Sequence, residues 1–483
     1  MLLDEPLIFE RGSAGSPGWQ VPGDDACDIP AELRREDDLD GFPEAGELEV
    51  LRHFLRLSQW NYSAATTFYP LGSCTMKYNP VVNEQLARLP GFAGLHPLIP
   101  AELAQGALEL CEALERALLA VSGLDAVSLQ PAAGAQGELL GMLLVREYHA
   151  ERGDARRQVL IPASAHGTNP ASSTLCGYRV TEVPVGGRGI LEARTVAALM
   201  NDGVAALMVT NPNTLGLFEE EIEAIAAVVH ERGGLLYMDG ANMNALVGVA
   251  RPGDMGVDVM QFNLHKTFST PHGGGGPGSG PVAVRSCLSD FLPVPRLVRQ
   301  GDRLAWSDDF PRTVGRVRSF YGNFGILVRA LGYIERLGGP GLEMATRLAI
   351  LNASYLRARL RDAFELPFDG PSMHECVFSD KTLAAHGVQT LDLAKRLLDY
   401  GFYAPTIYFP LVVKGAIMIE PTETESRATL DEFVAAMLAI AEEARTDPAT
   451  VRTAPHRTRL ERLDETRAAR RPILRWRPPA TRG

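Results

Sequence analysis

The sequence predicts an α/β protein built on a mostly parallel sheet with helices on both faces. Short apolar runs recur between residues 126 and 284, and helical patterns separate several of them. Buried strands that alternate with helices favour parallel pairing, because parallel strands need a crossover connection. Hydrophobic residues form 46% and charged residues 22% of the 483 residues, which is typical of a soluble globular protein. At roughly 150 residues per domain, this length predicts two or three domains.

The α/β core begins with an amphipathic helix over 102–121, where Leu108, Cys111, Leu114 and Leu118 recur at helical spacing. Helical patterns at 138–150 and 219–232 then alternate with apolar runs of the length of buried strands. The expected strands are Ala126–Leu129, Gln158–Ile161, Ala205–Val209, Leu235–Met238, Val257–Phe262 and Val282–Val284.

A smaller α+β domain is expected from about residue 318. Its helical patterns lie at 318–337, 341–364, 391–400 and 429–444, and its strands at Glu375–Phe378 and Ala416–Ile419. Residues 1–100 are rich in Pro and Gly, and turn-forming residues punctuate 68–80, which predicts an irregular arm; loops of this kind often carry function. The last stretch is rich in Arg and Pro. The predicted segments are therefore an N-terminal arm (1–100), a large α/β domain (101–317), a small α+β domain (318–445) and a C-terminal arm (446–483).

Composition excludes several classes of protein. The net charge of −12 argues against a nucleic-acid-binding protein, which usually carries a basic domain. No apolar run approaches the roughly 20 residues of a membrane span, and the acidic start of the chain does not resemble a signal peptide. The six cysteines are scattered without a CxxC pair, so neither a metal site nor a disulfide framework is expected. We therefore expect a cytoplasmic protein.

The segment Asn263–Gly280 presents Lys266 at the end of an apolar strand, before a run of glycines that lets backbone approach a ligand closely. A lysine at a strand end is usually only solvated. A dinucleotide motif at Gly273, Gly275 and Gly278 fails because prolines and glycines forbid the helix that must follow. A P-loop ending in Lys266-Thr267 lacks its two glycines. What remains is a lysine available for a Schiff base.

Other polar residues follow neighbouring strands. Asp239 ends one strand and precedes Gly240 and Ala241; it either caps the next element or holds a proton on the ring nitrogen of a flat cofactor. His166 follows another strand, and Thr210-Asn211 a third. Open α/β sheets usually bind their ligands at such strand ends.

The turn Gly134-Ala135-Gln136 begins a helix with small residues. Exposed backbone N–H groups and the helix dipole favour an anion such as phosphate there, although an ordinary tight turn is as good an interpretation. Together, a phosphate cradle, a ring-stacking histidine, an aspartate and a Schiff-base lysine match the requirements of pyridoxal 5′-phosphate.

The sequence resembles a known family, the glycine decarboxylase P-protein of the glycine cleavage system, also called glycine dehydrogenase (decarboxylating). The similarity extends over nearly the whole chain, including the tail at Arg462–Pro472, and Met243 replaces the usual Leu conservatively. The length and the presence of Lys266 resemble subunit 2 of the two-subunit form. The segments that carry the resemblance are Phe68–Pro80, Pro162–Pro170, Asp239–Ala245, Leu264–Pro281 and Glu420–Ser426.

The resemblance implies a pyridoxal-phosphate-dependent transferase of fold type I, similar to aspartate aminotransferase, with Lys266 and His166 as catalytic residues. Lys266 also holds the cofactor. Tyr69, Ser73 and Cys74 are candidates for the substrate entrance, and no metal is implied. The other implied cofactor-binding residues are Asp239, Ala241, Gly134, Ala135, Gln136, Thr210, Asn211 and His265, with His166 on the ring.

The implied reaction removes the carboxyl group of glycine as CO2 and transfers the aminomethyl group to the lipoyl arm of H-protein. The implied partners are a homologous subunit 1, with two copies of each subunit, and lipoylated H-protein. Two alternatives stay open. One is a pyridoxal-phosphate-dependent decarboxylase or lyase of another amino acid, and the other is a non-catalytic partner subunit, against which Lys266 argues.

Overall fold

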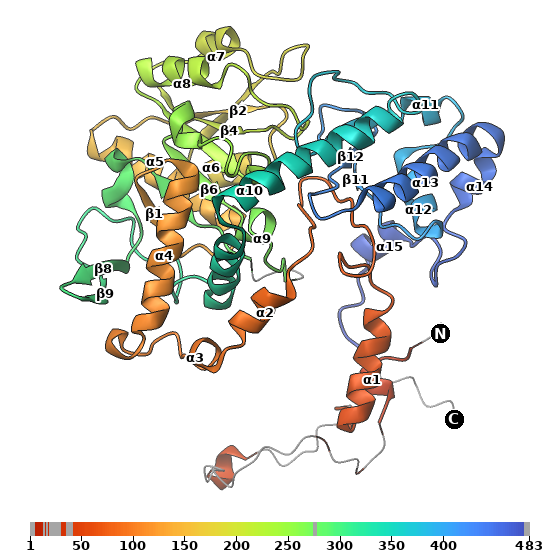
Figure 1. Cartoon of the computed structure of the whole chain (residues 1–483), viewed down its shortest axis with the longest axis horizontal. Coiled ribbons are helices and arrows are strands. Elements are labelled where there is room, and N and C mark those ends of the chain that lie inside the picture. The colour runs from red at the N-terminus through yellow and green to blue at the C-terminus, as the bar shows by residue number, and fades with distance from the viewer. Residues whose placement is uncertain are drawn as a thin grey trace. The chain divides into compact units, whose positions relative to one another are not determined.

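The computed structural model describes residues 5–12, 15, 18, 30–34, 42–273 and 278–477. Cys27, Gly275 and Pro277, which the sequence analysis considered, lie outside these residues. The chain divides into two compact units (Figure 1). One unit spans Thr67–Ala454, and the other combines the two ends of the chain, up to Thr66 and from Pro455. The four segments expected from the sequence stay a prediction.

A seven-stranded sheet forms the centre of the unit Thr67–Ala454, in the order β1-β7-β6-β5-β4-β2-β3. The neighbours from β6 to β3 are parallel, and β7 is antiparallel to both β6 and β1. The predicted mostly parallel sheet is confirmed. Its strands are β1 (Ala126–Ser128), β2 (Gln158–Pro162), β3 (Arg179–Val183), β4 (Val204–Thr210), β5 (Leu235–Gly240), β6 (Val259–Phe262) and β7 (Val282–Val284).

Helices cover both faces of this sheet. Leu236 and Met238 of β5 pack into a core with α4 (Gln105–Ser122), α7 (Ala193–Leu199), α8 (Ile222–Glu231) and the first half of α10 (Phe324–Leu360). Tyr237 points to the opposite face, into a core with α5 (Gly134–Glu151) and Cys176 after α6 (Thr168–Leu175). Successive side chains of a strand alternate between faces. A continuous apolar run such as β5 is therefore stable only when both faces are covered.

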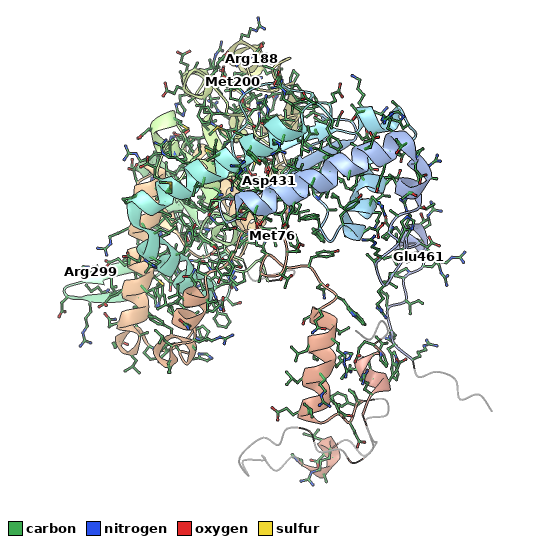
Figure 2. All side chains as sticks on the ribbon, turned by 45° about the vertical axis from the view of Figure 1, so that its right-hand side comes forward. Met76, Arg188, Met200, Arg299, Asp431 and Glu461 are labelled. Atoms are coloured by element: carbon green, nitrogen blue, oxygen red, sulfur yellow. The ribbon has the colours of Figure 1, made fainter. Side chains whose placement is uncertain are left out.

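Helix α10 connects the part of this unit built on the seven-stranded sheet to a smaller α+β part. It bends at Gly338, whose φ of 61° is not helical, next to Pro340, so a break falls between the two helices expected at 318–337 and 341–364. Beyond the bend, Leu356 and Leu360 pack with Phe378 and Phe433. Arg359 of α10 donates to Asp431 of α13 at 3.0 Å, and the two helices lie side by side (Figure 2).

The smaller part of this unit has the expected α+β arrangement. A three-stranded antiparallel sheet has the order β10-β12-β11. Its elements are β10 (Cys376–Ser379), β11 (Thr406–Ile407), β12 (Ala416–Ile419), α11 (Lys381–Ala384), α12 (Thr390–Asp399), α13 (Arg427–Thr446) and α14 (Pro448–Thr453). The remaining elements of the unit are α2 (Val81–Ala87), α3 (Pro90–Ala93), η3 (Ala101–Leu103), η4 (Met243–Ala245), η5 (Pro252–Met255), α9 (Leu264–Thr267), η6 (Ser286–Phe291), β8 (Arg296–Gln300) and β9 (Arg303–Ser307).

The two ends of the chain pack on each other in the second unit. Its elements are η1 (Ile8–Glu10), η2 (Ala31–Leu33), α1 (Glu47–Ser58) and α15 (Glu465–Arg470). The Arg459 guanidinium lies 4.0 Å from the centre of the Trp60 ring, and the rings of Phe9 and Trp476 stack at 5.0 Å. The expectation of irregular structure over 1–100 is wrong for α1, an amphipathic helix of 12 residues. None of the helices in the described part of the chain is long and apolar enough to cross a membrane.

Candidate active site

Lys266 occupies a short helix, α9, directly after β6. Its ammonium group forms no hydrogen bond or ion pair with any other side chain that the structure describes. The positive charge nevertheless acts on the pKa of titratable groups from several elements, which places them around it. These groups are Cys74, Glu138, His166, His265, His272, His374, Glu375 and Glu420.

Asp239 ends β5, the strand next to β6, and is 2% exposed. Its Oδ1 accepts two hydrogen bonds, from Gln261 Nε2 at 2.5 Å and from the Ala241 N–H at 2.9 Å. The other oxygen, Oδ2, has only a long contact of 3.5 Å with Thr210 Oγ1. The local hydrogen bonds therefore fix the carboxylate and leave Oδ2 able to accept a hydrogen bond from a ligand.

Thr210 and Asn211 end β4 beside Asp239, since Thr210 is the register partner of Asp239. Asn211 is fully buried, and its Oδ1 accepts from the Glu219 N–H at 3.0 Å. Its Nδ2 has no hydrogen-bond partner. Because a buried donor without a partner costs free energy, this amide is suited to an acceptor that a ligand brings.

His166 lies after β2 with its ring partly open to solvent. Its Nδ1 accepts hydrogen bonds from the Thr168 N–H at 3.2 Å and the Thr168 hydroxyl at 2.8 Å. Desolvation lowers the pKa of His166, and Lys266 adds to this effect while Asp239 opposes it. The ring is thus a neutral, oriented plane that carries its proton on Nε2, as stacking on a flat ligand requires.

The first turn of α5 contains Gly134, Ala135 and Gln136, the predicted phosphate turn. None of their three N–H groups has a described acceptor, whereas the Gly137 N–H bonds to Ala133. The Gln136 side chain is committed elsewhere: Oε1 accepts from the Ala132 N–H at 2.7 Å, and Nε2 donates to the Val317 carbonyl at 2.8 Å. Gln136 therefore contributes a backbone donor to the anion site.

His265, the residue before Lys266, accepts a hydrogen bond on Nδ1 from the Ser279 N–H at 3.2 Å. Burial lowers the pKa of His265 to about 3, with contributions from His272 and Lys266. The neutral ring therefore carries its proton on Nε2, which can donate to a ligand. Several buried polar atoms of this segment lack a partner in the described chain: Thr267 Oγ1, Thr270 Oγ1, His272 Nε2 and Ser279 Oγ.

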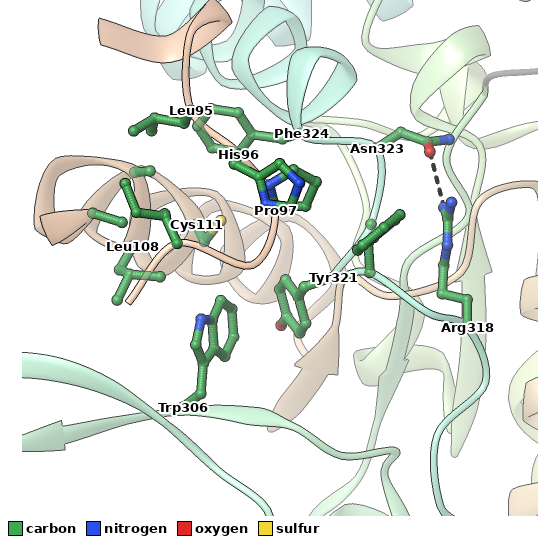
Figure 3. A pocket seen from close by; sticks show the side chains of 15 residues that line it. Leu95, His96, Pro97, Leu108, Cys111, Trp306, Arg318, Tyr321, Asn323 and Phe324 are labelled. Carbon is green, nitrogen blue, oxygen red and sulfur yellow. Dashed lines mark hydrogen bonds between the residues drawn. The ribbon is translucent and has the colours of Figure 1, made fainter. Parts of the chain in front are cut away.

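Asn323, one of the residues that line a pocket of about 270 Å³ (Figure 3), connects that pocket to the loops beside this anion site. Leu108, Cys111 and Trp306 contribute to its apolar wall, and Arg318 donates to Asn323 Oδ1 at 2.9 Å. Asn323 Nδ2 in turn donates to the Gly278 carbonyl at 2.6 Å and reaches that of Ala132 at 3.4 Å. Asn323 therefore joins the two loops that flank the start of α5.

The predicted entrance residues occupy the turn after Phe68. Cys74 lies within electrostatic reach of Lys266, whose charge opposes the rise that burial causes in the pKa of Cys74, to about 11. Tyr69 stacks on Tyr403 with ring centres 4.3 Å apart, and burial raises its pKa. The structure thus places Cys74, the neighbour of Ser73, within electrostatic reach of the lysine, while Tyr69 packs on Tyr403.

Glu138 was not assigned a role from the sequence, although it follows the phosphate turn. It is 5% exposed, and its Oε2 has no partner in the described chain. Burial raises its pKa to about 9, with a further contribution from Asp239. The folded protein therefore keeps a proton on Glu138 at neutral pH.

We expect this proton to make stability depend on pH. The folded pKa of about 9 exceeds the ordinary value of 4.5, so the unfolded chain releases a proton that the folded chain retains. The free energy of unfolding should fall between pH 5 and 9 by up to about 1.4 kcal/mol per pH unit from this group. Glu138→Gln should remove this slope in urea titrations, whereas the exposed control Glu109→Gln should not. Equal slopes in all three proteins would contradict the expectation.

The sequence comparisons identify close relatives. The sequence profile of the glycine dehydrogenase C-terminal domain matches residues 345–457, and that of class-V aminotransferases matches 142–276. The probable glycine dehydrogenase (decarboxylating) subunit 2 of Caldanaerobacter subterraneus is 51% identical over 97% of this chain and 98% of its own length. The protein of the same name from Chlorobium chlorochromatii is 53% identical over 97% and 98%.

Solved structures extend the likeness to the fold. A crystal structure of the glycine decarboxylase P-protein, in inhibitor-bound form, has a TM-score of 0.72 at 21% identity and covers 86% of this chain and 93% of its own. A sphingosine-1-phosphate lyase from Burkholderia pseudomallei has a TM-score of 0.60 at 17% identity, over 87% and 96%. The fold expected from the sequence, that of the fold type I pyridoxal-phosphate enzymes, is confirmed. The chain belongs to the family of glycine dehydrogenase (decarboxylating) subunit 2.

Proposed function

We propose that this chain is the catalytic subunit of a glycine decarboxylase that works with pyridoxal 5′-phosphate. In the proposed reaction glycine loses its carboxyl group as CO2, and the aminomethyl group passes to the lipoyl arm of H-protein. The observation that carries the proposal is the unpartnered Lys266 ammonium beside Asp239, His166 and the open start of α5. A purely structural subunit has no need for a lysine held in this way.

The residues around Lys266 fit pyridoxal phosphate. A β-carbon on Gly134 would come within 2.3 Å of Asn263 Oδ1, and one on Gly280 within 2.0 Å of the Ala133 carbonyl, so only glycine fits at these two positions beside the anion site. Buried donors without partners include Ser279 Oγ, next to His265, and Asn211 Nδ2, after β4. A phosphate and a ring oxygen are the acceptors that such donors need.

Each protein group then has a definite task. Lys266 Nζ would hold the cofactor covalently, and Asp239 Oδ2 would accept the ring N–H, while His166 and Ala241 flank the ring. The N–H groups of Gly134, Ala135 and Gln136 and His265 Nε2–H would bind the phosphate, and Thr210 or Asn211 the ring oxygen. When bound, pyridoxal phosphate supplies an electron sink for the bond that breaks at the glycine α-carbon.

The relatives' name supports one proposed partner, and the proposed reaction requires the other. Subunit 2 implies a homologous subunit 1, for which we propose two copies of each chain, and the transfer step needs lipoylated H-protein. We propose that the assembly works in the cytoplasm. Ser73 and Cys74, beside Lys266, are the proposed boundary of the substrate entrance, together with Tyr69.

The decisive experiment is isotope exchange between labelled bicarbonate and the glycine carboxyl group. Exchange should require this chain, subunit 1, pyridoxal phosphate and lipoylated H-protein, and omission of any one should reduce it to background. A matched reaction with alanine in place of glycine should give no exchange. If this chain alone decarboxylates a larger amino acid at full rate, the glycine assignment is wrong.

A further inference from the structure

Two buried carboxyl groups lie under the entrance turn. Glu375 immediately precedes β10, and Glu420 immediately follows β12. Cys376 pairs with Ile419 across these antiparallel strands, so the two glutamates come together at one end of the small sheet. Both are fully buried. Polar atoms of Glu375, Glu420 and the equally buried His374 all lie within 4.8 Å of one another.

The carboxyl groups hold the turn by two matching pairs of hydrogen bonds. Ser73 donates its N–H to Glu375 Oε2 at 2.7 Å and its hydroxyl to Oε1 at 3.2 Å. Thr75 donates its N–H to Glu420 Oε2 at 2.8 Å and its hydroxyl to Oε1 at 2.6 Å. Cys74 lies between these two residues.

The backbone of this turn is strained. Ser73 and Thr75 have φ angles of 58° and 48°, in the left-handed region that residues other than glycine seldom occupy. Such residues persist when the surrounding structure fixes them. The hydrogen bonds to the two glutamates provide this constraint, so the conformation of the turn depends on the acid pair.

Two full negative charges cannot share this enclosed space without a large cost. Burial raises the pKa of Glu420 to about 7 and raises that of Glu375 well above its usual range, with Glu420 adding to the latter. His374 cannot neutralise the pair, because burial lowers its pKa to about 3. Its Nε2 is 3.9 Å from Glu375 Oε1 and 4.0 Å from Glu420 Oε1, beyond hydrogen-bond distance. The other titratable groups that act on the pair or lie against it are Cys74, Lys266, Cys376 and Glu423.

We propose that Glu375 and Glu420 form a latch that shares one proton and holds the turn Ser73–Thr75 closed beside Lys266. Glu375 keeps the proton, and Glu420 is the carboxylate that binds Thr75. Loss of the shared proton leaves two charges under the turn and releases it, so the turn opens in alkaline solution. The glutamates are positioning residues. Their part in glycine decarboxylation rests on the proposed function, whereas the latch itself does not.

Alkylation of Cys74 by iodoacetamide tests the latch directly in the full-length chain. The rate at Cys74, resolved by peptide mass spectrometry, should rise with pH because only the thiolate reacts. Ionisation of a thiol with a pKa of about 11 gives at most about a tenfold increase per pH unit below that pKa. Proton-linked opening multiplies this increase, so the wild-type rate should climb by more than tenfold per pH unit between pH 7 and 9. Cys287 is exposed and serves as the internal control for the reagent. Its alkylation rate should rise by no more than tenfold per pH unit.

The variant Glu375→Gln/Glu420→Gln has no proton to share and should return the Cys74 increase to about tenfold per pH unit. Glu375→Gln alone should also return the Cys74 increase to about tenfold per pH unit, because Glu420 then has no second carboxylate beside it. This single variant replaces the double variant if the double variant does not fold. A wild-type increase of tenfold or less, or an increase that the variants do not change, would overturn the latch.

Two further measurements distinguish the proton latch from a metal site and from the proposed function. Treatment with EDTA should leave the wild-type pH profile unchanged; a changed profile would mean that His374 and the two glutamates hold a metal ion, and the proton latch would be wrong. The bicarbonate exchange assay reports the proposed function independently. The expected thiol profile without any exchange would retain the latch and refute the function, and exchange with an ordinary thiol profile would do the reverse.

Discussion

Replacement of Lys266 by alanine is expected to lower glycine–bicarbonate exchange by about a thousandfold or more, the scale on which loss of a covalent catalytic group acts. The substitution removes the amine that is proposed to hold the cofactor, and no other lysine can take its place at the end of β6. The chain has five lysines: Lys77, Lys266, Lys381, Lys395 and Lys414. Of these, Lys77 is buried and ion-paired with Glu423.

Borohydride trapping supplies the second readout. Reduction in the presence of pyridoxal phosphate should make the cofactor–lysine linkage permanent, and peptide mapping should find the label on Lys266 alone. Lys266→Arg, which retains a positive charge, should be as inactive as the alanine variant, because its guanidinium is a poor nucleophile. Lys381→Ala is the matched control, since its side chain is 75% exposed, and it should keep full exchange. A label on any other lysine would refute the role of Lys266.

The central sheet was predictable because its strands are continuous apolar runs. Strand β5, for example, begins with four apolar residues between Gly234 and Gly240, a run too short for a helix and typical of a strand covered on both faces. Strand β3 was missed, because Arg179, Thr181 and Glu182 give this edge strand the composition of a loop. Helix α1 was missed because it lies in a region otherwise punctuated by turn residues, where the helical spacing of Leu48, Leu51 and Leu55 was outweighed.

The candidate site divides in the same way. Asp239 and Lys266 were identified because each follows an apolar run, and parallel strands bring such positions to one edge of the sheet. Glu375 and Glu420 also lie at strand ends, but in the three-stranded antiparallel sheet. They come together only because β10 pairs with β12, 43 residues further along the chain. A sequence pattern does not specify that pairing, and it does not reveal that two carboxyl groups are completely buried. Their hydrogen bonds to Ser73 and Thr75 span more than 300 residues.

Lys77 is a buried cation that no sequence pattern separates from the turn residues around it. It is 4% exposed, and its three N–H groups lie within hydrogen-bond distance of four acceptors: Glu423 Oε1 at 2.7 Å, the Thr267 carbonyl at 2.7 Å, Asn244 Oδ1 at 2.8 Å and Tyr333 OH at 3.2 Å. Burial alone lowers the pKa of a lysine, but Glu423 and Tyr333 raise that of Lys77 above its usual value. The ammonium therefore ties the entrance segment to the residue after Lys266.

Lys77→Met is expected to destabilise the unit Thr67–Ala454 by about 3–5 kcal/mol, the usual cost of leaving one partner of a buried ion pair alone. The loss should appear as a lower midpoint of urea and thermal unfolding. Lys414→Met, at an exposed position, is the matched control and should change stability by less than about 0.5 kcal/mol. Equal effects of the two substitutions would show that the four contacts of Lys77 contribute little.

The double variant Lys77→Met/Glu423→Gln isolates the cause. If the cost arises from an unpaired carboxylate, removing that charge should restore part of the stability, because Gln can still accept from Tyr333 and no buried charge is left.

The pH dependence of the stability contributed by the Lys77–Glu423 pair follows from the pKa of both partners. The raised pKa of Lys77 keeps its contribution complete below the ordinary value of 10.5, and the lowered pKa of Glu423 keeps its contribution complete above 4.5. The difference in free energy of unfolding between wild type and Lys77→Met/Glu423→Gln, which has neither titrating group, should therefore be constant from pH 6 to 9. A difference that shrinks within this range would mean that the pair is not fully charged in the folded protein.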